Sequence, residues 1–217
     1  MRNRAFKIIA TSIALLGLVG QPASALTVQK VPFVSQAPMG RWSDARQQNG
    51  CEEASVMMAM AWVRGKTLTK QKAEQDIIAV SKFEEKKYGS STDTSAQDTA
   101  RRILKGYFKY DRWVVAPIVS PNDIIRELNK GKIAIVPVNG RALKNPYYKP
   151  PGPRYHMLVI IGYDSTTKQF ITNDPGTRRG AGYRYGRNRL FQALRDYPSG
   201  EHQPIAVKKK FAIFIEK

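Results

Sequence analysis

Two apolar segments in the last third of the chain constrain its fold more than any other feature. Residues 133–138 (IAIVPV) and 156–163 (HMLVIIGY) are rich in β-branched side chains and contain very few polar ones. Runs of this length and composition are typical of strands that are buried on both faces. The chain is therefore expected to build its core around a sheet.

The second of these segments is followed by a hairpin partner. Residues 164–168 (DSTTK) have the composition of a turn, and residues 169–173 (QFITN) have that of a returning strand. A further alternating segment, residues 206–215, is expected to form the last strand. Because a hairpin places its strands side by side, the start of the 156–163 strand and the residues after 173 should lie at one end of the sheet.

Helix signals dominate the chain before residue 131. The clearest is Ser120-Pro121-Asn122-Asp123, with serine at the N-cap, proline at N1 and an acid at N3. Helices that precede an antiparallel sheet predict the α+β class and one domain. The expected helices are 51–63, 69–87, 95–105, 120–129 and 188–194, with an edge strand at 28–34 and a loop at 36–50.

Residues 1–25 have the layout of a secretory signal peptide. Three cations precede an apolar run over residues 8–20, and small residues occupy positions 23–25. The run is shorter than the roughly 20 residues that span a bilayer, which favours cleavage after Ala25 over a retained membrane anchor. The expected mature protein is therefore a single domain over residues 26–217, secreted or held in the cell envelope or periplasm.

The chain is strongly basic, with a formal net charge of +19, of which the signal segment supplies three cations. Such an excess favours polyanionic surroundings, among them anionic lipid, cell-wall polymers, acidic proteins and nucleic acid. No nucleic-acid motif accompanies the charge, and an exported protein rarely meets nucleic acid, so no nucleic-acid partner is expected. We interpret the charge as a surface that adheres to the envelope; the sequence does not fix the oligomeric state.

Cys51 is the only cysteine, so no intramolecular disulfide can form and stability must come from packing. It lies where the 36–50 loop enters the first expected helix. The positive end of a helix dipole favours the thiolate, which is the nucleophile of cysteine catalysis. The alternative is that Cys51 is a small buried hydrophobe. Glu52 and Glu53, in the first turn, stabilise the helix through its dipole but oppose thiolate formation.

His156 opens the most apolar strand, and the hairpin brings Asn173 and Asp174 to the same end of the sheet. This arrangement predicts an imidazole with an orienting amide or carboxylate beside it. Taken singly, a strand-terminal histidine and an Asp-Pro-Gly turn each have a structural explanation. Taken with Cys51, they are the parts of a cysteine-nucleophile triad. The second histidine, His202, lies in a polar loop and is expected to be solvated.

Other kinds of site lack the residues they need. A metal site requires several Cys, His or carboxylate ligands at regular spacing, which the sequence does not provide. The glycines of the basic 176–182 loop lack the strand-to-helix context of a phosphate-binding motif. No metal or cofactor is expected.

Four short segments together resemble the papain-fold cysteine peptidases of the bacteriocin-leader (double-glycine) type. The resemblance is closer still to their exported relatives, the C-39-like family domains, and it covers essentially the whole mature chain. It implies a papain-like fold in which an N-terminal helical half packs on a C-terminal antiparallel sheet. The segments are VPFVSQ (31–36), GCE (50–52), HMLVIIGYD (156–164) and NDPG (173–176).

The resemblance also implies roles for site residues. Cys51 is the nucleophile, and His156 is the general base that later protonates the leaving amine. Asp174 fixes the imidazole tautomer, with Asn173 as the alternative.

The fold also implies a glutamine that completes the oxyanion hole. Gln36 matches the family segment, whereas Gln47 and Gln48 are closer to Cys51 in sequence. The implied activity is hydrolysis of peptide or amide bonds in a peptide or protein substrate, through a thioester acyl-enzyme. Two alternatives are a catalytically idle envelope-binding module on the same fold and an acyltransferase that uses an amine acceptor.

Overall fold

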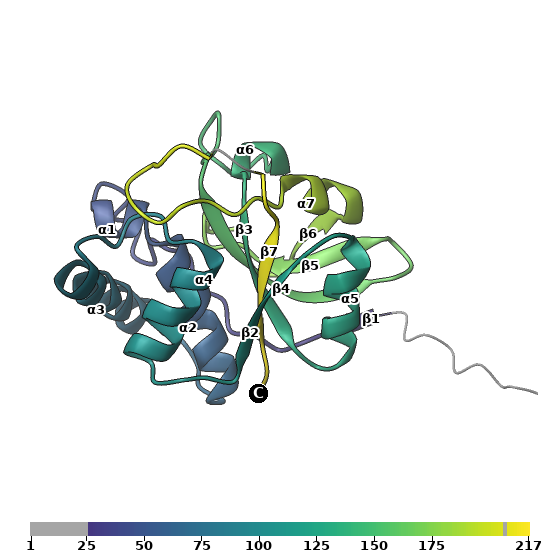
Figure 1. The fold of residues 1–217 in the computed structure, drawn as a ribbon, viewed down its shortest axis with the longest axis horizontal. Coiled ribbons are helices and arrows are strands. Elements are labelled where there is room, and N and C mark those ends of the chain that lie inside the picture. Colours follow the sequence, from purple (N-terminus) through teal and green to yellow (C-terminus); the bar gives the residue numbers. More distant parts are fainter. Residues whose placement is uncertain (1–25, 206–207) are drawn as a thin grey trace, which may run out of the picture.

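The computed structural model describes residues 26–205 and 208–217, so the expected signal segment at 1–25 lies outside the described residues (Figure 1). Its centre is a seven-stranded antiparallel sheet with the order β2-β7-β3-β4-β5-β6, and β1 pairs with β4. The strands are β1 Leu26–Val28, β2 Trp113–Pro117, β3 Ile133–Val138, β4 His156–Asp164, β5 Gln169–Asn173, β6 Tyr183–Gly186 and β7 Phe211–Ile215.

Helices cover both faces of this sheet, and Figure 1 shows α1 to α4 gathered on one side of it, with α5 and α7 on the other. This is an α+β architecture, as predicted. None of the helices in the described ranges is long and apolar enough to span a membrane. The helices are α1 Ala45–Gln48, α2 Cys51–Val63, α3 Lys70–Tyr88, α4 Ala96–Thr99, the π-helix η1 Ala100–Tyr107, α5 Pro121–Asn129, α6 Gly140–Leu143 and α7 Arg187–Ala193.

The central strands supply the core on both faces, because successive side chains of a strand point to opposite sides. Ile133 and Ile135 of β3 pack in the cluster formed with α2, α3 and η1. Ala134 and Val136 pack in the second cluster, with α5 and α7. Every residue of β3 is buried, which confirms the prediction of a strand covered on both faces.

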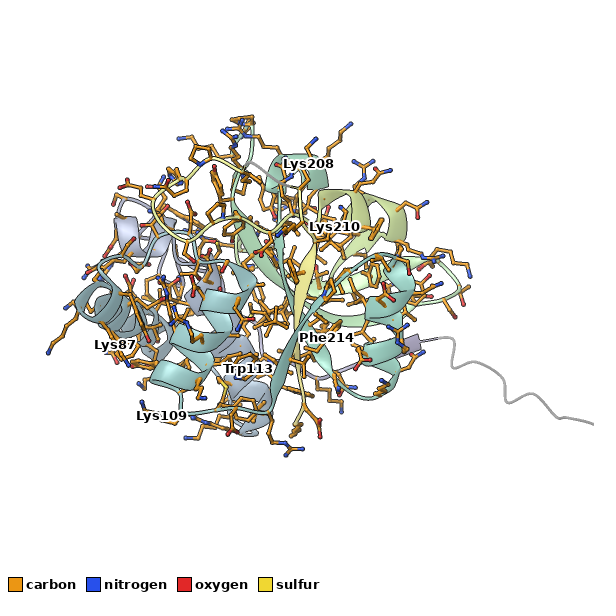
Figure 2. The ribbon with its side chains drawn as sticks, viewed as in Figure 1. Lys87, Lys109, Trp113, Lys208, Lys210 and Phe214 are labelled. Carbon is orange, nitrogen blue, oxygen red and sulfur yellow. The ribbon has the colours of Figure 1, made fainter. Side chains whose placement is uncertain are left out.

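The edge strand β2 and its neighbour β7 show the same division. Trp113 of β2 packs against the α2 side of the sheet, whereas Phe214 of β7 is buried on the α5 side (Figure 2). The basic side chains instead project around the outline of the molecule, as Lys87, Lys109 and Lys208 illustrate in Figure 2. The charge of the chain therefore lies outside a conventional apolar core.

Helix α2 is the buried element on which the site is built. All its residues from Cys51 to Trp62 are buried between the sheet and α3. The Ser55 hydroxyl donates a hydrogen bond to the Met157 carbonyl of β4 at 3.3 Å. The helix ends at Val63 as predicted, and Gly65 follows with a φ of +62° that favours glycine.

Local capping signals predicted the other long helices well. Ser120 accepts a hydrogen bond from the backbone N–H of Asn122, and Asp123 accepts one from the N–H of Ser120 at 2.8 Å. Thr69 caps α3, and Gly89 ends it with a φ of +81°. The helix expected at 95–105 is capped by Ser95, but it continues as a π-helix to Tyr107.

Several expectations about irregular segments are wrong. The strand expected at 28–34 ends at Val28, because Pro32 has no N–H and the Val31 carbonyl bonds instead to the side-chain amide of Asn173 at 3.0 Å. Of the strand expected at 206–215, residues 206–207 lie outside the described residues, residues 208–210 are not in a strand, and β7 runs from Phe211 to Ile215. The 36–50 loop contains the short helix α1, and strands β2 and β6 had not been predicted.

Candidate active site

Cys51 is the first residue of α2, as the sequence predicts. It follows Gly50, where a side chain could not fit because a Cβ would lie 2.6 Å from the Arg46 carbonyl oxygen. The Cys51 side chain is only 5% exposed. Its thiol donates a hydrogen bond to Oε2 of Glu52 at 2.9 Å. The nucleophile candidate is therefore paired with a carboxylate in its own helix turn.

Glu52 is held in place by contacts from outside α2. Its Oε1 accepts a hydrogen bond from the Tyr197 hydroxyl at 2.8 Å and one from the backbone N–H of Thr94 at 3.3 Å. Burial first, and then the Glu52 charge, raise the pKa of the Cys51 thiol well above its usual value. Burial likewise raises the pKa of Glu52. These effects outweigh the helix dipole, so Cys51 is a thiol in this structure.

Two more buried acids lie behind this pair. Glu53 is 1% exposed and Glu84 is fully buried. Within the described part of the chain, both carboxyl oxygens of Glu84 and Oε2 of Glu53 are buried without a hydrogen-bond partner. Burial raises the pKa of Glu84 to about 8, and burial first, then the nearby Glu84 carboxyl, raises the pKa of Glu53 well above its usual value. Glu84 is therefore mainly protonated at neutral pH.

His156 is the first residue of β4 and is 1% exposed. Its Nε2 lies 2.8 Å from Oδ1 of Asp174, which follows directly after β5 and is fully buried. A proton on Nε2 that is donated to the carboxylate leaves a free lone pair on Nδ1. This pair can hold the imidazole in one orientation and can stabilise a positive charge on it.

Two tyrosines complete the surroundings of Asp174. The hydroxyls of Tyr148 and Tyr185 donate hydrogen bonds to Oδ2 at 2.5 and 2.6 Å, and the Gly176 N–H donates one to Oδ1 at 3.0 Å. Burial would raise the pKa of Asp174, but the imidazole and the hydroxyl donors outweigh it, and the net pKa is lowered. Asp174 is therefore a carboxylate with every lone-pair direction in use.

A β-bulge decides which residue of the hairpin reaches His156. The β4–β5 register shifts between Ile160 and Gly162, so that Asn173 pairs with Val159. Continuing this register places Asp174 on the sheet face of His156 and Asn173 on the opposite face. The Asn173 side chain accordingly donates to the Val31 carbonyl. The structure thus brings Asp174, and not Asn173, to the imidazole.

The three candidate glutamines have different surroundings. Gln36 is buried and lines the same cleft as Cys51 and His156; its Nε2 donates to the Gln48 backbone carbonyl at 2.6 Å. Among the described residues its Oε1 has no partner. Gln47 is fully buried and does not line the cleft, whereas Gln48 lines the cleft but is exposed. Of the three, Gln36 is thus the one whose buried side-chain amide lies in the cleft.

The prediction that His202 is merely solvated is incomplete. Its Nδ1 lies 2.7 Å from Oδ2 of Asp93, and its ring stacks on Tyr155 with centroids 5.4 Å apart. These residues belong to the wall of the cleft, which has a volume of about 1000 Å³ and opens over Cys51 and His156. Tyr148, Tyr185 and Tyr197 also belong to the site, although no local pattern in the sequence indicates them.

Comparisons with known proteins bear on the family and the fold of this chain. The profile of the Peptidase_C39 like family matches residues 28–199. A solved structure described as a "putative C39-like peptidase from Bacillus anthracis" aligns with a TM-score of 0.53 at 15% identity, over 88% of this chain and 98% of that one, and so shares the fold. No curated protein matches the chain. The match over residues 28–199 shows that this chain belongs to the Peptidase_C39 like family.

Proposed function

We propose that this protein is a cysteine peptidase that hydrolyses peptide or amide bonds with Cys51 as nucleophile. The observation that carries the proposal is the buried His156–Asp174 pair, which opens onto the same cleft as Cys51 at the start of α2. Membership of the C39-like family supports a peptidase of this type. The papain-like form of the fold is part of the same proposal.

The proposed reaction has two halves. The Cys51 sulfur attacks the scissile carbonyl carbon while its proton passes to Nδ1 of His156. The imidazolium then protonates the leaving amine, the C–N bond breaks and a thioester remains on Cys51. Water, deprotonated by the same imidazole, attacks the thioester carbonyl and releases the carboxylic acid and the thiol.

Asp174 supports the imidazolium in both halves. Its carboxylate lies 2.8 Å from Nε2, and two tyrosine hydroxyls fix its position. A buried charge beside the imidazole stabilises the protonated ring and keeps the tautomer that leaves Nδ1 free for the thiol proton. We therefore infer that Tyr148 and Tyr185 are positioning residues that act through Asp174.

Gln36 is the proposed side-chain donor of the oxyanion hole, together with the backbone N–H of Cys51. Its Nε2 already lies in the cleft and is bonded to the Gln48 carbonyl at 2.6 Å. A rotation of this amide toward the substrate would exchange that carbonyl for the developing oxyanion. Donors of this kind stabilise the tetrahedral intermediate more than the substrate.

Glu52 gives a second candidate function its specific support. The thiol is buried and bonded to a carboxylate, which keeps it unreactive and so favours a module that binds peptides without cutting them. In the peptidase proposal, Glu52 keeps the resting sulfur protonated until the substrate carbonyl and His156 are in place. An acyltransferase would use the same first half-reaction, with an amine in place of water.

One experiment separates these candidates. The protein is incubated with peptides from a denatured protein digest, with and without an added amine, and new termini are identified by mass spectrometry. A peptidase creates free carboxyl termini that disappear in Cys51→Ala. Amine-capped termini would indicate an acyltransferase, and identical patterns for wild type and Cys51→Ala would indicate the idle module.

We also propose that the protein acts outside the cytoplasm. The support is the pattern of cations, apolar run and small residues over residues 1–25. Expression of the whole chain in a bacterial host tests it. A secreted or envelope form whose N-terminal residue is Leu26 is expected, whereas an uncleaved cytoplasmic form would contradict the proposal.

A further inference from the structure

We infer that the cleft over Cys51 selects peptide segments that carry acidic side chains beside the scissile bond. The inference rests on the proposed peptidase function and names the substrate class of that same site. It comes from the charges and aromatic rings that form the walls of the cleft.

The cleft is far more cationic than the chain as a whole. Its lining contains five arginine or lysine side chains and one carboxylate, whereas the whole sequence has 36 basic and 17 acidic residues. All five cations are exposed, and none forms an ion pair with a carboxylate of the described residues. The five are Arg141, Lys149, Arg154, Arg178 and Arg179.

Arg141 lies in α6, and the other four cations stand on two separate loops that both border the reacting residues. One loop connects α6 to β4 and ends at His156, and the other follows Asp174 and leads into β6. Figure 1 shows the first as the green loop that rises above the sheet beside α6. A peptide bound across Cys51 would therefore have positive charge within reach from more than one side.

Contacts within the cleft wall place several of these side chains. The Arg179 guanidinium lies over the Tyr147 ring at 4.9 Å, and Arg141 donates from Nε to the Gly152 carbonyl at 3.1 Å. Arg178 lies against Gly40, where an added Cβ would be 2.3 Å from its guanidinium. Guanidinium groups held in this way lose less freedom when they bind a carboxylate in two-pronged fashion.

One carboxylate against five cations leaves the cleft with an excess of positive charge. That carboxylate, Asp93, is oriented by the backbone N–H of His202 at 2.8 Å and by the His202 ring at 2.7 Å. The half-buried ring of Trp42 and the exposed ring of Tyr147 offer flat surfaces for the peptide between the charged positions. A peptide is favoured over other polyanions because the cations flank a site with a nucleophile and an imidazole at its base.

Binding to the Cys51→Ala variant tests the inference independently of catalysis. The probes are three fluorescein-labelled dodecapeptides of alternating alanine with Glu, Gln or Lys, since alternation presents the charge in either register. Affinity is measured by fluorescence anisotropy at 50 and 200 mM salt. We expect the Glu peptide to bind at least about tenfold tighter than the Gln peptide at the lower salt, and to weaken as salt screens the charges.

Two double variants in the Cys51→Ala background locate the effect. Arg178→Gln with Arg179→Gln should weaken Glu-peptide binding by about tenfold or more, because two cleft cations are lost. Lys66→Gln with Lys70→Gln removes the same charge from exposed positions that do not line the cleft, and it should change the affinity less than about twofold. A circular dichroism spectrum identical to that of the parent establishes that each variant is folded.

Three outcomes would overturn the inference. They are undetectable or equal binding of the Glu and Gln peptides, equal losses in the two double variants, and tighter binding of a single-stranded oligonucleotide with the same number of charges. The last would assign the cleft to a general polyanion. If the Glu peptide binds as expected but the wild-type protein cuts nothing, the proposed function fails while the acidic selectivity stands.

Discussion

Replacing Glu52 by glutamine should make Cys51 a more reactive thiol. The substitution keeps the shape of the side chain and removes its charge. The glutamine oxygen can still accept from Tyr197 and Thr94, which now bond to Oε1 of Glu52. Its amide nitrogen then faces the Cys51 sulfur and can donate to a thiolate, so one change both removes a repulsion and adds a donor.

The magnitude follows from the geometry. The sulfur lies 2.9 Å from Oε2 of Glu52. With the charge shared between both oxygens, an effective separation of about 4 Å and a dielectric constant of about 20 give a repulsion of about 4 kcal/mol between thiolate and carboxylate. Removing this repulsion raises the thiolate population, but a less basic thiolate is also a weaker nucleophile, with a Brønsted slope of about 0.45. Of the roughly 4 kcal/mol, about 2 kcal/mol is therefore left to lower the barrier of the exchange reaction. The exchange rate should rise roughly 40-fold.

Thiol–disulfide exchange with neutral 4,4′-dithiodipyridine measures this rate between pH 6 and 9. Cys51 is the only cysteine, so the released thiopyridone reports on it alone. Glu53→Gln is the matched control: it replaces the neighbouring buried acid, which acts on the thiol less strongly than burial and Glu52 do, and it should accelerate exchange less. Unchanged or slower exchange in Glu52→Gln would refute the reasoning and would make Glu52 an acceptor of the thiol proton.

Three further predictions concern catalysis and stability. Asp174→Asn keeps an oxygen for His156 but removes the charge that supports the imidazolium. The kcat for peptide cleavage should therefore fall by about 10²-fold, with little change in melting temperature. Unaltered turnover would contradict the role of Asp174 in supporting the imidazolium. Gln36→Ala should lower kcat by about 10²–10³-fold with KM nearly constant. Gln48→Ala is the control, since it leaves the backbone carbonyl in place, and it should have little effect. Equal losses in the two variants would contradict the assignment of Gln36 to the oxyanion hole. Glu84 keeps its proton up to about pH 8 in the folded protein and releases it near 4.5 when unfolded. The unfolding free energy should therefore fall by up to about 1.4 kcal/mol per pH unit as pH rises through that window, and urea titrations at pH 5 and 8 should show a weaker dependence in Glu84→Gln; an identical dependence would mean that Glu84 does not titrate as argued.

The elements that the sequence predicted well are those whose signals are local. Ser120 and Asp123 carry the start of α5 within four residues, and the apolar run of β3 indicates its own burial. Strand β2 pairs only with β7, nearly one hundred residues later in the chain, and its pattern is partly exposed. No local pattern in the sequence indicates that pairing, so β2 was not predicted.

The site divides in the same way. Cys51 and His156 could be placed because a helix start and a strand start are readable from the sequence. The choice of Asp174 over Asn173 depends on a one-residue bulge in β4, which alternation alone does not reveal. Tyr185 reaches Asp174 from β6, a strand that was not predicted from the sequence.

The burial of Glu52 and Glu53 is the main difference between expectation and structure. Acids in a first helix turn are usually exposed caps, but α2 is apolar on all sides and is covered all round. A helix without a polar face was readable from its composition. A helix of this composition must be covered on every side, so its charged residues are buried as well.

The most direct test of the central claim is the intact mass of the protein during turnover. Wild-type protein mixed with the denatured protein digest is quenched in acid, and the account predicts acyl adducts that neutral hydroxylamine removes, as expected of a thioester on Cys51. Cys51→Ala should carry no adduct, and His156→Ala should carry far less than wild type. Cleavage of the digest by Cys51→Ala at the wild-type rate, or a wild-type protein that neither acylates nor cleaves, would contradict the assignment of Cys51 as the nucleophile of a peptidase.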